Sequence, residues 1–197
     1  MRKPPETIKN FLPNDVFPRF ALESMKFPYF SPCDYTSQES EADGSIWTFG
    51  QDLRTVGIKK HEVMFQAVLF NRAIASCLSS DFYAKQSYCI GMLADLLNVK
   101  KWWMLRVNCT VGQDKNYVGR FHCDFDLDIP YIHENATTAI LYLNTNNGGT
   151  QFYDEDGPIV KSEANTLIKF PTSTRHAGVW ATDAKLRYVL NMTYETK

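Results

Sequence analysis

The sequence predicts a mainly β protein in which helices precede a two-sheet sandwich or jelly roll. After Val99 the 197-residue chain breaks into short runs of alternating apolar and polar residues, separated by Gly, Asn, Asp and Pro. Before that point, apolar residues recur at helical spacing. Aromatic residues make up 14% of the chain, which is typical of a β-rich globular protein.

The N-terminal segment carries few interpretable patterns. Asn14 or Asp15 is suited to cap a helix at the start of an apolar-periodic stretch. The segment Phe27–Asp43 combines prolines, aromatics and an acid-rich run, so it predicts an irregular loop. The aromatic residues of Phe27–Gln51 fit a lid over a site and a packed flank equally well, and within this region Trp47–Gly50 is a candidate short strand.

Two helices are expected before the alternating region. The first lies between His61 and Leu78, and the second runs from Ala84 to Leu97. His61 itself is interpreted as a solvated residue at a helix start. Helices that precede the sheets in sequence are expected to pack against one outer face of the sandwich.

Eight strands are predicted from the alternation, which is the number that a jelly roll needs. Turn residues at 146–149 and 154–157 are expected to form hairpins. The predicted strands are Trp103–Cys109, Tyr117–Asp124, Thr138–Leu143, Thr150–Tyr153, Ile159–Lys161, Thr166–Phe170, Arg175–Trp180 and Leu186–Tyr194.

Composition predicts a single domain over residues 1–197, with 1–100 as helical and loop support and 101–197 as the core that bears the site. The formal net charge of −1 gives no basic field for nucleic acid or membranes. Because no long apolar run and no signal peptide are recognised, a soluble, cytoplasmic protein is expected. Five cysteines without a Cys-x-x-Cys pair argue against a disulfide framework and a zinc site.

A metal site is predicted from His122, Asp124 and His176. His122 and Asp124 lie two apart on a predicted strand, so their side chains point to the same face. A second imidazole from a distant strand would complete the set of two histidines and one carboxylate that leaves positions open on iron(II). Oxygen-only calcium binding through Asp126 and Asp128 would leave both histidines unused, so these aspartates are expected on a solvated rim.

Four sequence features follow one another along the last half of the chain. They are His122-x-Asp124, Tyr142-Leu143-Asn144, the stretch from Gly148 to Phe152, and His176 followed by Arg187. Together they resemble the iron(II) and 2-oxoglutarate-dependent dioxygenases, and in particular their prolyl-hydroxylase-like branch. The resemblance implies a double-stranded β-helix, which is a cupin-like jelly roll, buttressed by helices.

The resemblance also implies a function, namely a dioxygenase that hydroxylates a peptide or protein side chain and releases succinate and CO2. His122, Asp124 and His176 would bind Fe(II), and Arg187 would pair with the distal carboxylate of 2-oxoglutarate. O2 is the second cosubstrate, and ascorbate is a further candidate cofactor. Asp124 favours hydroxylation or oxidative demethylation, because halogenating relatives have a small residue in its place.

Further cosubstrate contacts are assigned to residues that also have plainer explanations. Tyr142 matches a tyrosine that contacts 2-oxoglutarate in similar proteins, but ordinary sheet packing would explain it equally well. Asn191 shares a strand face with Arg187 and is a candidate for the same pocket. Where many relatives have a tyrosine on the first core strand, this chain has Thr110 or Asn108.

Two other residues compete for roles near the site. Lys185 lies two positions before Arg187 and is its rival for the carboxylate, although the pattern around Arg187-Tyr188-Val189 favours the arginine. His133 lies in the loop after the predicted ligand strand and is expected to be structural or to face the substrate.

Other functions remain open on the sequence alone. A small-molecule hydroxylase acting on an amino acid and a nucleic-acid demethylase would use the same metal site. Demethylases typically carry nucleotide-recognition hairpins where this chain predicts helices with a near-neutral charge. A jelly-roll ligand-binding module would bind neither iron nor 2-oxoglutarate. A cupin with other chemistry usually has two histidines on the early strand, whereas this chain has Cys123-Asp124 after His122.

Overall fold

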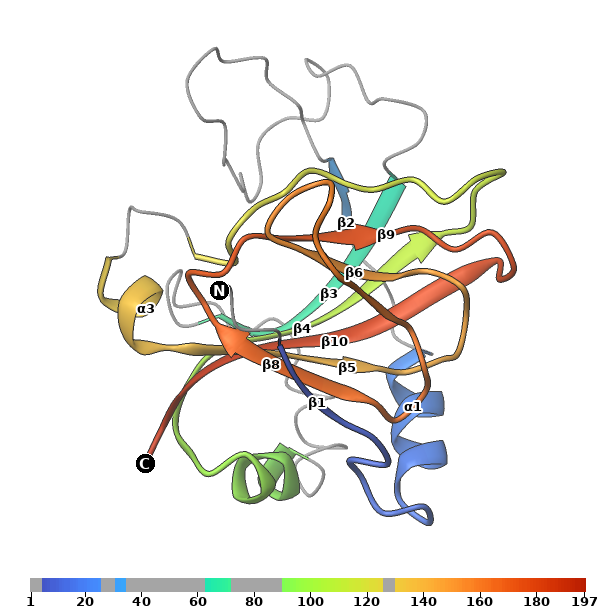
Figure 1. Cartoon of the computed structure of the whole chain (residues 1–197). Coiled ribbons are helices and arrows are strands. Elements are labelled where there is room, and N and C mark those ends of the chain that lie inside the picture. Colours follow the sequence, from blue (N-terminus) through green and yellow to red (C-terminus); the bar gives the residue numbers. More distant parts are fainter. Residues whose placement is uncertain (1–4, 26–30, 35–62, 72–89, 126–129) are drawn as a thin grey trace.

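The computed structural model describes residues 5–25, 31–34, 63–71, 90–125 and 130–197. In these residues two antiparallel sheets face each other (Figure 1). The major sheet has the order β1 (Glu6–Ile8), β8 (Leu167–Pro171), β5 (Thr137–Tyr142), β10 (Leu186–Thr196), β4 (Val99–Val111), β3 (Val63–Asn71) and β2 (Ser31–Asp34). The minor sheet has the order β7 (Ile159–Lys161), β6 (Gly149–Phe152) and β9 (His176–Val179). This confirms the predicted jelly roll.

The segment before Asp124 extends the minor sheet beside β9. Val118 bridges Val179, and His122 bridges His176, both in antiparallel pairing. The amide nitrogens of His122 and His176 each donate to the other residue's carbonyl oxygen at 2.9 Å. The predicted strand over residues 117–124 is therefore present as two isolated bridges, and its pairing places the two histidines side by side.

The connection from β5 to β6 differs from the expected hairpin. β5 lies in the major sheet and β6 in the minor sheet, so residues 143–148 cross from one sheet to the other. Glycine suits the arrival point, because a Cβ at Gly149 would collide with the carbonyl oxygen of Val160 on β7. The second predicted hairpin, at residues 154–157, is confirmed by the antiparallel pairing of β6 with β7.

The helix expected between His61 and Leu78 is wrong over the residues that the structure describes. Residues 63–71 form β3, which pairs with both β4 and β2. A nearly continuous apolar run fits a buried helix or a buried strand equally well, and here sheet pairing decides the outcome. β2 likewise replaces part of the irregular loop expected over Phe27–Asp43. The rest of that loop, and Trp47–Gly50, lie outside the described residues.

Both remaining helices are confirmed in part. α1 (Phe17–Met25) begins after a turn in which the carbonyl oxygen of Pro13 accepts hydrogen bonds from the next turn's amides. Neither Asn14 nor Asp15 therefore stands at the cap position. The second helix is described over residues 90–96 and ends where Asn98 adopts a left-handed φ of 53°. Residues 84–89 lie outside the described part.

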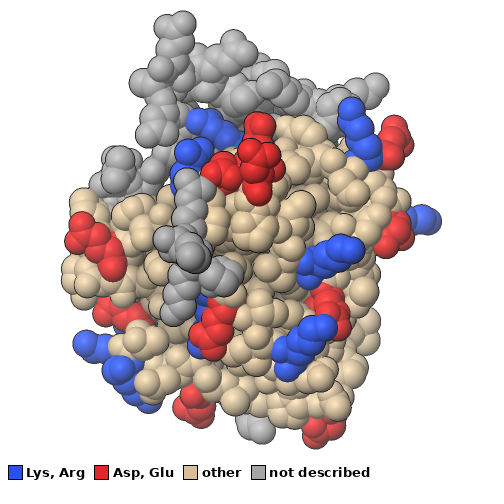
Figure 2. All heavy atoms as spheres, viewed as in Figure 1, with Lys and Arg blue, Asp and Glu red and all other residues tan. Residues whose placement is uncertain are grey.

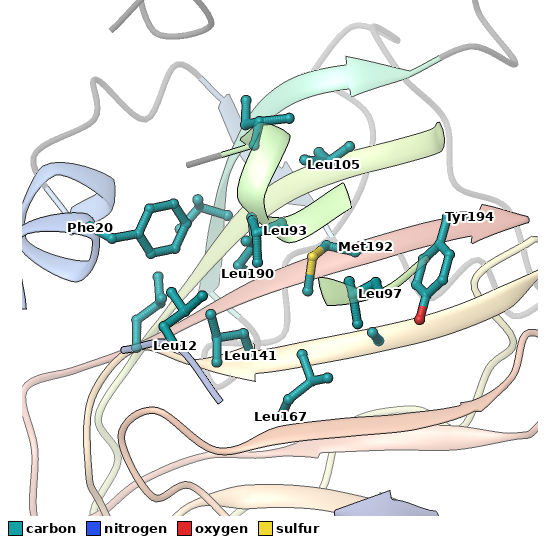
Figure 3. Close-up of a cluster of buried hydrophobic side chains, with 14 of the residues drawn as sticks. Leu12, Phe20, Leu93, Leu97, Leu105, Leu141, Leu167, Leu190, Met192 and Tyr194 are labelled. Atoms are coloured by element: carbon teal, nitrogen blue, oxygen red, sulfur yellow. The ribbon is translucent and has the colours of Figure 1, made fainter. Parts of the chain in front are cut away.

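The helices cover the outer face of the major sheet, as the sequence predicts. Phe20 from α1 and Leu93 from the second helix pack against the apolar outer residues of β4, β5 and β10 (Figure 3). Burial of each such side chain stabilises the fold by roughly 1.5–3 kcal/mol. No helix among the described residues has the length and apolar character needed to cross a membrane.

Neither Cys109 nor Cys123 forms a disulfide with any side chain that the structure describes. Burial raises the pKa of the Cys109 thiol to about 11, and a hydrogen bond with Tyr188 opposes that rise. Cys109 is therefore a packing residue of β4.

Candidate metal centre

Three side chains that are distant in sequence converge at one end of the minor sheet. His122 and Asp124 come from the bridged segment, and His176 is the first residue of β9. Their potential ligand atoms all lie within 4.8 Å of one another, and the two imidazole rings are 4.7 Å apart. Asp124 and His176 are buried, whereas His122 is half-buried. The structure thus brings together the three residues predicted as metal ligands.

Backbone contacts orient both imidazoles in the same way. Nδ1 of His122 lies 3.0 Å from the carbonyl oxygen of Arg120, and Nδ1 of His176 lies 3.0 Å from that of Thr174. Because a carbonyl oxygen only accepts hydrogen bonds, each Nδ1 carries the proton and each Nε2 carries the lone pair. In this tautomer the Nε2 atom of each ring is able to bind a metal.

The two oxygens of Asp124 have different surroundings. Oδ1 accepts hydrogen bonds from the Arg106 guanidinium at 2.8 Å and from the Asn191 amide at 3.0 Å. Oδ2 lies 3.8 Å from Nε2 of His176 and accepts no hydrogen bond from any described residue, although it is fully buried. A buried acceptor in this state is costly, so a ligand at Oδ2 would stabilise the site. Two imidazole nitrogens and one carboxylate oxygen fit a divalent iron ion.

The electrostatics keep both kinds of ligand in their binding form. Burial, reinforced by His176, lowers the pKa of His122 from 6.5 to about 4, so its ring is neutral near pH 7. Burial alone would raise the pKa of Asp124, but His176 and Arg106 more than offset this and hold it below 3.8. Asp124 is therefore ionised.

Aromatic residues surround His176, the first residue of β9. The ring of Phe170 lies 4.9 Å from that of His176 in an edge-to-face arrangement, and Phe152 lies 6.3 Å away. Both belong to an apolar cluster between the two sheets that also contains Ile140 and Ile168. The cluster holds the imidazole in place and provides a dry wall beside the metal-binding atoms.

Arg187 lies at the other end of the interior. It is only 5% exposed on β10, and its guanidinium donates to the carbonyl oxygen of Gly149 at 2.8 Å. The guanidinium carbon lies 5.6 Å from the centre of the Tyr142 ring. Burial raises the pKa of Tyr142, and nearby Arg187 opposes that rise. Lys185, by contrast, is exposed, so the strand register favours Arg187 as the interior cation.

A polar band joins Arg187 to Asp124 along the facing positions of β4 and β10. Thr110 pairs with Arg187, Asn108 with Val189, and Arg106 with Asn191. Among the described residues, the side-chain oxygens of Thr110, Asn108 and Asn191 are buried without a hydrogen-bond partner. Polar atoms in this state are rare in native interiors, so the band has the character of a ligand site rather than of a packed core.

This chain resembles known proteins in its three-dimensional fold, whereas comparisons of its sequence find no match. No protein-family model matches the sequence, and no curated protein matches it. Solved structures match across nearly the whole chain. A 2OG-Fe(II) oxygenase family oxidoreductase from Burkholderia pseudomallei matches with a TM-score of 0.62 and 11% identity over 96% of this chain and 85% of its own. The fold is that of the 2-oxoglutarate and iron(II) oxygenases.

Two further solved structures with a similar fold contain different bound molecules. A prolyl hydroxylase from Trichoplax adhaerens, in complex with a hypoxia-inducible factor peptide, has 18% identity and a TM-score of 0.56 over 97% of this chain and 83% of its own. A protein from Streptomyces hygroscopicus, with nickel, 2-oxoglutarate and hygromycin B bound, has 10% identity and a TM-score of 0.54 over 97% and 82%. At these identities the likeness establishes the fold alone.

Sequence reasoning missed Arg106, which contacts Asp124 directly. The sequence does contain a sign of this role. Arg106 is a basic residue in the middle of β4, its sequence neighbours there are apolar or neutral, and the alternation of the strand places it on the inner face. Asn191 is predicted to contact the cosubstrate, and in the structure its amide nitrogen donates to Asp124. His133 contacts the carbonyl oxygen of Phe125 through Nδ1 at 3.0 Å, which agrees with a structural role. Asp126 and Asp128 lie outside the described residues.

Proposed function

We propose that this protein is an Fe(II)- and 2-oxoglutarate-dependent dioxygenase that hydroxylates a side chain within a peptide or protein. The observation that carries the proposal is the buried Oδ2 of Asp124, which has no hydrogen bond from the described residues and faces Nε2 of His176. A ring nitrogen of His122 belongs to the same group of ligand atoms, which all lie within 4.8 Å of one another. Iron(II) is the metal that this ligand set suits best in an oxygenase fold.

In this proposal His122, Asp124 and His176 hold the metal on one face and leave the opposite positions open. The bound iron, with 2-oxoglutarate and O2, would supply the oxidising power that replaces a C–H bond by C–OH and yields succinate and CO2. The protein's own contribution is to fix the ligands and to exclude water. Phe152 and Phe170 serve the second purpose, because they line the His176 side of the site.

Arg187 would hold the distal carboxylate of 2-oxoglutarate. A guanidinium offers two parallel N–H donors to a carboxylate, and its burial strengthens the attraction. Tyr142 would support this contact from β5. Its hydroxyl, which lies 3.0 Å from Thr150 Oγ1 and 3.1 Å from the carbonyl oxygen of Val160, would donate its hydrogen bond to the incoming carboxylate in place of these acceptors. Asn191 would act beside the metal, through Asp124.

Three substrate classes are compared, namely a peptide, a small molecule and a nucleic acid. The likeness of Tyr142-Leu143-Asn144 and the following glycines to prolyl hydroxylases, together with the peptide-bound structural neighbour, supports a peptide. The neighbour with hygromycin B supports a small molecule as the second candidate. Nucleic acid is disfavoured, because Lys and Arg alternate with Asp and Glu over the face in Figure 2 and the net charge is −1.

The test is the iron-dependent formation of succinate from 2-oxoglutarate by the purified protein. Turnover should require Fe(II) and should rise when a peptide library supplies the substrate. Stimulation by amino acids or other small molecules alone would select the second candidate, and stimulation by methylated oligonucleotides would select a demethylase. A protein that binds neither iron nor 2-oxoglutarate would be a ligand-binding module. The matched control is His176→Ala, in which the turnover should be lost.

A further inference from the structure

Arg106 forms a deeply buried ion pair with the predicted metal ligand. It lies in the middle of β4, and its guanidinium NH2 group is 2.8 Å from Oδ1 of Asp124. The two side chains are 3% and 0% exposed. Such a pair costs a large desolvation energy, so its presence beside a metal ligand calls for an explanation beyond stability.

The ion pair and the metal would use different oxygens of the same carboxylate. Arg106 and Asn191 both donate to Oδ1, whereas Oδ2 faces His176. With two hydrogen bonds already accepted by Oδ1, Asp124 has one oxygen to offer a metal. The arrangement therefore enforces binding through Oδ2 alone and keeps a neighbouring position open.

We propose that Arg106 is a positioning residue that restricts Asp124 to one metal-binding oxygen, and whose charge weakens metal binding while strengthening anion binding at the same centre. This inference rests on the proposed function. It assigns a role to Arg106 of β4, which has none in the proposed function.

The electrostatic reason lies in the balance of buried charges. Without Arg106, the carboxylate of Asp124 would cancel part of the charge of a divalent cation. With Arg106 the carboxylate is already paired, so the metal would enter a site whose ligands bring no net charge. A nearby cation repels the metal and attracts an anion such as 2-oxoglutarate. At an effective dielectric constant of about 20, the charge of one guanidinium a few ångströms from the metal changes the affinity for a metal or an anion on the order of tenfold or more.

A purely structural ion pair predicts a different result. If Arg106 only ties β4 to the segment that carries Asp124, its loss would loosen the whole site. Metal affinity and anion affinity would then fall together. The proposed role predicts changes of opposite sign, which loosening of the site does not produce.

The experiment uses cobalt(II) as the metal probe and measures two affinities for the full chain. Cobalt(II) binding is followed by its visible absorption, and 2-oxoglutarate is then titrated into the cobalt-loaded protein. Arg106→Gln removes the charge but keeps an N–H donor for Oδ1. It should bind cobalt(II) about tenfold more tightly and 2-oxoglutarate about tenfold more weakly than the wild type.

Two variants control for other effects. Arg106→Lys keeps the charge, so both affinities should stay within about threefold of the wild type. Lys185→Gln removes an exposed cation of the same chain and should leave both affinities unchanged.

A parallel fall of both affinities in Arg106→Gln would overturn the inference and leave the proposed function intact. A wild-type protein that binds no cobalt(II) would overturn the inference together with the metal centre. If Arg106→Gln does not fold, Arg106→Lys decides alone. A change of more than about threefold in either affinity of the lysine variant would then refute the role of the charge.

Discussion

At the scale of single residues, the site depends on backbone carbonyls as much as on side chains. The carbonyl oxygens of Arg120 and Thr174 each stand two residues before a histidine and fix its tautomer. Both contacts are local in sequence, and the backbone pairing of His122 with His176 then brings the two oriented imidazoles side by side.

Arg187 provides the first prediction at this scale. Arg187→Ala should weaken 2-oxoglutarate binding by roughly 2–5 kcal/mol, because the distal carboxylate would lie buried without its partner. Metal affinity should change little, since Arg187 lies at the far end of the polar band. Calorimetric titration of the metal-loaded protein measures the loss. Lys185→Ala is the matched control, and a larger effect there than at Arg187 would show that the wrong cation was assigned.

The low pKa of His122 predicts how the metal-free protein responds to acid. Between pH 6.5 and about 4, the unfolded chain protonates this histidine and the folded chain does not. Stability therefore falls as the pH falls through this window, by at most about 1.4 kcal/mol per pH unit from this group. Urea unfolding in the presence of a chelator gives the slope. His122→Gln should flatten it, and an unchanged slope would mean that the group does not titrate in this way.

At the scale of secondary-structure elements, periodicity located the strands well and the helices less well. β4 and β10 alternate apolar and polar residues because their apolar face packs under the helices and their other face carries the polar band, and this pattern is visible in the sequence. β3 has no such alternation, so its conformation depends on pairing with β4, which a local pattern does not contain.

Particular residues show what a sequence can and cannot reveal about the site. His122, Asp124 and His176 were identifiable because their residue types and spacing match a known metal chemistry. The Arg106–Asp124 pair was not, because a lone arginine in a strand has no partner in the sequence pattern and its contact depends on how β4 lies against a distant segment. Asn191 was placed on the correct strand face, but its hydrogen bond required the folded chain.

The second helix provides a prediction about whether its packing stabilises the fold without affecting the metal centre. Leu93 is fully buried against the outer face of the major sheet, whereas Leu96 is 50% exposed. Leu93→Ala should cost about 2–5 kcal/mol of folding free energy, because it leaves a cavity under the helix. Leu96→Ala should cost less than about 0.5 kcal/mol. Denaturant unfolding tests both values.

The same pair of variants tests whether the helix influences the metal centre. Leu93 lies on the outer face of the sheet, and the proposed ligands lie at the minor sheet. The metal affinity of the folded Leu93→Ala protein should therefore equal that of the wild type. A reduced affinity would mean that packing of the helix reaches the ligands through the major sheet.

At the scale of the whole molecule, the jelly roll separates three tasks. The helices stabilise the outer face of the major sheet, the apolar cluster between the sheets holds the interior together, and the polar band of β4 and β10 runs through that interior. The minor sheet supplies both imidazoles, and the Arg106 and Asn191 contacts tie their carboxylate partner to the major sheet. The proposed metal would thus stand where the two sheets are joined.

The central claim is that His122, Asp124 and His176 bind one iron(II), and metal stoichiometry tests it most directly. The measurement is the amount of Fe(II) bound per chain under anaerobic conditions, compared between the wild type and His176→Ala. Circular dichroism should first establish that the variant is folded. We expect one tightly bound iron per wild-type chain and a loss of tight binding in the variant, because only two ligands would remain. Full iron loading of folded His176→Ala would contradict the assignment.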